Sequence, residues 1–135
     1  MRIAVFRKAH FNAAHKLYRE DWSPEKNKEV FGLCSNENYH GHNYELEVKV
    51  VGEVDPETGF LIDLKDLKDI IKKEVEDRFD HKNFNLDTPY FTDKNPTSEN
   101  ICFLIHELLT AAMDPKFEIT VRLWETPRNY VEYPA

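Results

Sequence analysis

The most constraining feature of this sequence is a segment in which apolar and charged residues alternate one by one. It runs from His42 to Val51, with apolar Leu46, Val48 and Val50 between charged Glu45, Glu47 and Lys49. Successive side chains of a β-strand point to opposite faces, so the pattern predicts a strand with one buried and one solvated face. The rest of the chain must then supply neighbouring strands and a cover for the buried face.

Other segments meet both needs. Residues 3–15 and 116–124 read as strands, and residues 130–133 as a last short strand. Apolar residues recur at helical spacing after Asp63, up to about Phe79, and again between Thr97 and Met113. The order β-β-α-α-β-β predicts an α+β domain, with a four-stranded antiparallel sheet covered by two helices on one face. Such a sheet leaves two unpaired edges, which favours association with further copies.

Composition excludes several classes of protein. The chain has 135 residues, of which 41% are hydrophobic, so we expect one soluble domain over residues 1–135. A net charge of −7 argues against a general nucleic-acid surface, which needs a basic stripe. No run approaches the ~18 apolar residues of a membrane span, and no signal peptide is recognisable. With only two cysteines, the expectation is a cytoplasmic protein without membrane association.

A candidate metal site lies next to the alternating strand. His40 and His42 flank Gly41, and both share the parity of the apolar face, so their imidazoles point to the buried side. His15 ends the first strand, where the small Ala14 leaves room beside it. A lone pair of histidines is a weak signal, because histidine is common in ordinary polar strands. Together, however, these histidines match the three ligands of a catalytic zinc site, which keeps one position open.

Several motifs occur in order along most of the chain. They are Phe11-x-Ala13-Ala14-His15-x-Leu17, Cys34-x5-His40-Gly41-His42-Asn43-Tyr44, Gly52-x-Val54-Asp55-x2-Thr58-Gly59, Leu64-x2-Leu67-Lys68, Asp80-His81-Lys82-Asn83, Pro96-Thr97-Ser98-Glu99-Asn100 and Glu125-Thr126. With them the chain resembles the 6-pyruvoyl-tetrahydropterin synthase family, in which we include the 6-carboxytetrahydropterin synthases of queuosine (deazapurine) biosynthesis. A small departure is Phe79, where the family pattern has Leu before the Asp-His pair.

The resemblance implies a fold, an assembly and a reaction. The fold is the tunnelling fold (T-fold), in which three subunits close a barrel and two trimers stack into a hexamer, with active sites at subunit interfaces. The activity is that of a carbon–oxygen lyase acting on 7,8-dihydroneopterin triphosphate, with elimination of triphosphate. The cofactor is Zn²⁺, held by His15, His40 and His42.

The resemblance also implies roles for single residues. Cys34 is the general base, and Asp80 and His81, contributed across an interface, lower its pKa. Glu125, which has the parity of apolar Leu123, accepts hydrogen bonds from the pterin edge. Thr97 and Glu99 match family positions that help hold the substrate, and Lys16, Arg19 and Lys82 are candidate contacts for the phosphates.

Three alternatives stay open at this point. In the first, Cys34 is a fourth zinc ligand in a closed structural site, which leaves Asp80, His81 and Glu125 without roles. A zinc-containing pterin-binding module is the non-enzyme alternative. The product is either 6-pyruvoyl-tetrahydropterin, of tetrahydrobiopterin synthesis, or 6-carboxytetrahydropterin, of queuosine synthesis. The five residues between Cys34 and His40 favour the pyruvoyl product.

Overall fold

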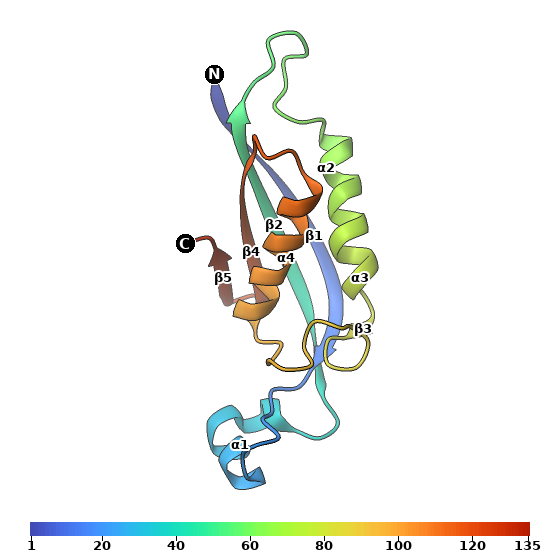
Figure 1. The fold of residues 1–135 in the computed structure, drawn as a ribbon, viewed down its shortest axis with the longest axis vertical. Coiled ribbons are helices and arrows are strands. Elements are labelled where there is room, and N and C mark those ends of the chain that lie inside the picture. The colour runs from blue at the N-terminus through green and yellow to red at the C-terminus, as the bar shows by residue number, and fades with distance from the viewer.

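The computed structural model describes residues 1–135 as one layer of strands and one layer of helices (Figure 1). The elements in chain order are β1 (Arg2–His15), α1 (Pro24–Phe31), η1 (Gly32–Ser35), β2 (His40–Glu53), α2 (Leu64–Ile71), η2 (Lys72–Glu76), α3 (Asp77–Phe79), β3 (Lys82–Asn83), α4 (Ser98–Ala112), β4 (Glu118–Thr126) and β5 (Asn129–Tyr133). The short helix α1 and the 3₁₀ turn η1 lie beyond the end of the sheet, where β1 ends and β2 begins (Figure 1).

The sheet confirms the predicted α+β architecture and corrects one detail. Its strand order is β3-β1-β2-β4-β5, so it has five strands and not the four expected. The additional strand, β3, has two residues and pairs parallel to β1, whereas every other pairing is antiparallel. His81 has a positive φ of 60°, which turns the chain after Asp80 and lays Lys82 beside Ala13. A pairing this short has no alternation that a sequence pattern could reveal.

The alternation in β2 has the predicted consequence for the core. Val48 and Val50 are fully buried, whereas Glu45 on the opposite face is exposed. The buried face is covered by α2 and α4, whose residues Leu67 and Ile105 have no exposed surface. Burying an aliphatic side chain of this size contributes about 1.5–3 kcal/mol. The other face of the sheet carries no helix (Figure 1).

Both predicted helices form, and each begins with a side-chain cap. The Asp63 carboxylate accepts the backbone N–H of Lys65 and so begins α2, while the Thr97 hydroxyl accepts that of Asn100 and begins α4. The helix that begins with α2 contains a π-helical turn, η2, before it continues as α3 and ends with the buried Phe79. None of the helices has the length and apolar composition needed to cross a membrane.

Candidate metal centre and active site

Three histidine side chains meet where β1 ends and β2 begins. His15 is paired with His40 across the two strands, and His42 lies opposite Ala13. The Nε2 atom of His15 lies 3.0 Å from that of His40 and 3.2 Å from that of His42. Two ligands of one tetrahedral zinc ion, each bonded at 2.0–2.1 Å, are about 3.3 Å apart. The histidines are therefore placed to hold a metal ion, as predicted.

The surroundings of His15 leave its Nε2 atom free to bind a metal. Its Nδ1 atom lies 2.8 Å from the carbonyl oxygen of Pro96. A carbonyl only accepts, so Nδ1 carries the proton and donates it, and Nε2 keeps its lone pair. Metal-binding histidines usually make an outer hydrogen bond of this kind. Burial lowers the pKa of both His15 and His42, which favours the neutral rings that bind metals.

The carboxylate of Glu125 borders the histidine group. Glu125 lies near the end of β4, and its side chain is 26% exposed. One oxygen, Oε1, lies 3.3 Å from Nε2 of His42, and the other, Oε2, accepts a hydrogen bond from the hydroxyl of Ser98. These two contacts place Glu125 on the buried side, as its shared parity with Leu123 predicted.

A cavity of about 440 Å³ opens beside Glu125, and the N-terminus of α4 forms part of its wall. The predicted residues Thr97 and Glu99 both line it. The Thr97 hydroxyl is engaged as the helix cap, whereas Glu99 is exposed. Ser98, between them, was not singled out from the sequence, although it belongs to the same motif. Its contact with Glu125 joins residues that are 27 positions apart, so only the tertiary structure reveals it.

Cys34 lies in the short turn η1 and is half-buried. Its carbonyl oxygen accepts the backbone N–H of Leu17 at 2.8 Å, which ties η1 to the chain just after His15. Burial raises the pKa of the thiol, and the negative charge of Glu125 raises it further, so the thiol is protonated at neutral pH. The group of ligand atoms that all lie within 4.8 Å of one another consists of His15, His40 and His42, and does not include Cys34. Cys34 is thus not positioned as a fourth ligand.

Asp80 and His81 form a pair at the edge of the sheet, beside β1. Asp80 accepts the backbone N–H of Asn12 at 2.9 Å, which lowers the pKa of its carboxyl, and its other oxygen lies 3.1 Å from Nδ1 of His81. The backbone N–H of His81 donates to the Asn12 carbonyl at 2.6 Å. The His81 side chain is 83% exposed. No hydrogen bond or ion pair joins the pair to Cys34 within the chain.

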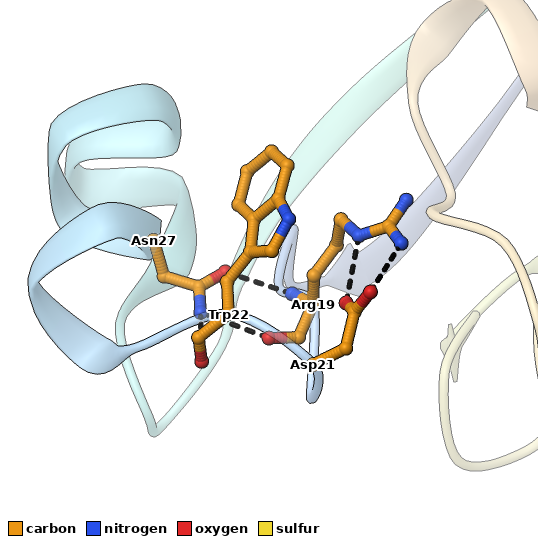
Figure 2. A network of polar contacts seen from close by, with 4 residues as sticks. All are labelled: Arg19, Asp21, Trp22 and Asn27. Atoms are coloured by element: carbon orange, nitrogen blue, oxygen red, sulfur yellow. Dashed lines mark hydrogen bonds and ion pairs between the residues drawn. The ribbon is translucent and has the colours of Figure 1, made fainter.

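The basic residues considered for the phosphates differ in their surroundings. Lys16 and Arg19 line a cavity of about 590 Å³, which Lys82 does not border. Figure 2 shows that the Arg19 guanidinium is held by the carboxylate of Asp21, with contacts of 2.8 and 2.6 Å. The buried Asn27 side chain bonds the backbone of Arg19 on both sides, at 2.7 and 2.9 Å. Among the three candidates, Lys16 is the one that lines this cavity without a carboxylate partner.

Residues 4–135 match the family model of 6-pyruvoyl tetrahydropterin synthase. The chain belongs to this family. A 6-pyruvoyl tetrahydrobiopterin synthase of Pongo abelii is 42% identical over 129 residues, which cover 96% of this chain and 89% of the relative. The solved structure of the Caenorhabditis elegans 6-pyruvoyl tetrahydropterin synthase superposes with a TM-score of 0.93 at 38% identity, covering 100% of this chain and 96% of that one. These matches confirm the predicted enzyme family and its tunnelling fold.

Two relatives with other activities in their names are less similar to this chain. A dihydroneopterin monophosphate aldolase of Pyrococcus furiosus is 30% identical and covers 93% of this chain and 91% of its own. A 6-carboxy-5,6,7,8-tetrahydropterin synthase of Rickettsia conorii is 28% identical and covers 96% of this chain and 99% of its own. This chain is therefore more similar to the pyruvoyl synthases of Pongo abelii and Caenorhabditis elegans than to these two relatives.

Proposed function

We propose that this protein converts 7,8-dihydroneopterin triphosphate to 6-pyruvoyl-tetrahydropterin, with elimination of triphosphate and with Zn²⁺ as its cofactor. The observation that carries the proposal is the carboxylate of Glu125 beside three convergent histidine nitrogens. Its Oε1 atom lies 3.3 Å from Nε2 of His42. The Glu125 carboxylate can accept hydrogen bonds from the guanidine-like edge of a pterin ring. The side chain of the same pterin would then reach the metal site beside it.

The histidine group fits zinc in number, atom type and spacing. His15, His40 and His42 would hold the ion through Nε2, and a catalytic site with three protein ligands keeps a position for substrate. Zinc bound there would supply a Lewis acid able to polarise a hydroxyl of the pterin side chain and to acidify the neighbouring C–H. The ring itself is held by the protein, because Glu125 accepts the N–H groups at N2 and N3 as a fork.

Proton transfer falls to Cys34 with Asp80 and His81. The chain alone keeps the thiol protonated, because burial and Glu125 both raise its pKa. A base therefore needs a partner that takes the thiol proton. Asp80 holds Nδ1 of His81 at 3.1 Å, which leaves Nε2 of the exposed ring to exchange a proton with a thiol. Since the pair does not contact Cys34 in its own chain, we propose that a neighbouring subunit supplies it within a hexamer of two trimers.

The pyruvoyl product is favoured over the carboxy product by similarity. The pyruvoyl synthases of Pongo abelii and Drosophila melanogaster are 42% and 36% identical to this chain, whereas the carboxy synthase of Rickettsia conorii is 28% identical. The spacing of five residues between Cys34 and His40 favours the same product. We place the reaction in the cytoplasm, in keeping with two cysteines that are both free.

The test is to incubate zinc-loaded protein with 7,8-dihydroneopterin triphosphate and to identify the products by mass spectrometry. We expect 6-pyruvoyl-tetrahydropterin and inorganic triphosphate, and no turnover after zinc is removed with a chelator. A 6-carboxytetrahydropterin product would assign the chain to the queuosine branch. Tight pterin binding without any product would favour the binding module over the enzyme.

A further inference from the structure

The two carboxylate oxygens of Glu125 contact different residues, Ser98 and the metal-site residue His42. Oε2 accepts the hydroxyl proton of Ser98, at the N-terminus of α4, and Oε1 lies 3.3 Å from Nε2 of the ligand His42. The ligand atoms that all lie within 4.8 Å of one another are those of His15, His40 and His42, and Glu125 does not belong to this group. The carboxylate therefore lies beside one metal ligand, but it is held outside the full ligand group.

A carboxylate in this place can take over the metal position meant for substrate. Zinc binds carboxylate oxygens at about 2.0–2.2 Å, and two ligands of one tetrahedral ion are about 3.3 Å apart. Oε1 already has that separation from one ligand of the group, His42. The last torsion of a glutamate side chain is broad, so an untethered carboxylate turns easily. A fourth protein ligand would convert an open catalytic site into a closed one.

Ser98 is well placed to prevent this. It is the first residue of α4, which has 15 residues and starts at the N-cap Thr97. Thr97 already accepts the N–H of Asn100, so the cap does not need the Ser98 hydroxyl. The N-terminus of a helix also favours a negative charge beside it. The hydroxyl is thus carried on a rigid element and directed at Oε2 of Glu125.

We propose that Ser98 is a positioning residue that holds the Glu125 carboxylate toward the cavity and away from the metal. The proposal rests on the proposed function of Glu125 as the pterin anchor, which it deepens. Ser98 fixes one oxygen and leaves the remaining lone pairs free for the N–H groups of the ring. Without it, Glu125 both binds the pterin less well and competes with substrate for the metal.

The test compares Ser98→Ala with Ser98→Thr, which keeps the hydroxyl. For zinc-loaded protein, we expect Ser98→Ala to weaken biopterin binding about tenfold, the effect of losing one hydrogen bond at a charged group. We also expect it to slow the release of zinc to a chelator, because Glu125 becomes a further ligand. Ser98→Thr should restore both values. The matched control is Ser23→Ala, which removes the N-cap of α1 and should change neither.

A double-mutant cycle with Glu125→Gln tests whether Ser98 acts through Glu125. In the Glu125→Gln background, Ser98→Ala should no longer slow zinc release, because the carboxylate that would become the further ligand is absent. Zinc release at the wild-type rate in Ser98→Ala, or slower release that persists without the carboxylate, would overturn the proposal. The chelator measurement needs no pterin. If the wild-type protein binds no biopterin, the result counts against the proposed function. The role of Ser98 is then tested by the rate of zinc release alone.

Discussion

Replacing Glu125 by glutamine should weaken pterin binding while zinc stays bound. The change keeps the size of the side chain but turns one acceptor into an N–H donor. In the structure Oε2 is occupied by Ser98, so the amide oxygen of glutamine can keep that bond. The amide N–H₂ group then replaces Oε1 and faces the N–H donors of the ring. Two donors that face each other cannot both be satisfied.

The size of the effect follows from the contacts that are lost. A hydrogen bond to a charged group contributes about 1.5–3 kcal/mol. The Glu125 side chain is 26% exposed, so water screens part of its charge. The loss of one hydrogen bond therefore costs a free energy near the lower end of this range. Adding the cost of the unpaired donors gives about 2–3 kcal/mol. That corresponds to an increase in Kd of about 30- to 150-fold.

Calorimetric titration of zinc-loaded protein with biopterin, a non-reactive pterin, measures this change. The matched control is Glu118→Gln, an exposed carboxylate at the other end of the same strand, which pairs with Arg2. The control should bind biopterin like the wild type, and all three proteins should contain equal zinc. Equal affinity of wild type and Glu125→Gln would refute the assignment of the carboxylate as the ring anchor.

Three further predictions test the metal, the base and the pH dependence. His40→Ala combined with His42→Ala should abolish zinc binding, and normal metal content by mass spectrometry would contradict the ligand assignment. Cys34→Ala should keep zinc but lose about 10²–10⁴-fold in turnover. If each active site combines residues of two subunits, mixing Cys34→Ala chains with His81→Ala chains should restore part of the activity. No recovery of activity would argue against active sites shared between subunits. Burial lowers the pKa of His15 below 6.5, so the unfolded chain binds more protons than the folded chain at slightly acidic pH. Urea unfolding of the metal-free protein should therefore show a free energy of unfolding that falls as pH drops below about 6.5, and that falls less in His15→Gln. An equal dependence on pH in wild type and His15→Gln would contradict the pKa shift.

Local periodicity accounts for most of the fold that could be predicted. The alternation in β2 identified the buried face, and the parity of His40 and His42 with Val48 placed the imidazoles on it. Because the pattern has a period of two, it is readable from a few residues. The same reasoning placed Glu125 on the buried side of β4. The predicted metal group therefore depended on strand geometry that the sequence displays directly.

What could not be predicted depends on contacts between distant segments. The strand β3 exists because His81 adopts a positive φ and its backbone bonds to Asn12, and no pattern encodes this. The π-helical turn η2 lies within an uninterrupted helical stripe and leaves no signal in it. The contact between Ser98 and Glu125 needs α4 to dock against β4, which periodicity in either element does not specify.

Metal binding depends on the correct register between β1 and β2. The strands are paired continuously from Arg2 with Glu53 to His15 with His40. A slip of one residue would move every side chain of one strand to the other face, and would separate His15 from its two partners. Only the in-register hairpin offers a complete set of ligands. An ion that binds this set and no other would select the native pairing from its misaligned competitors, so that metal supply would govern the yield of folded protein as well as its turnover.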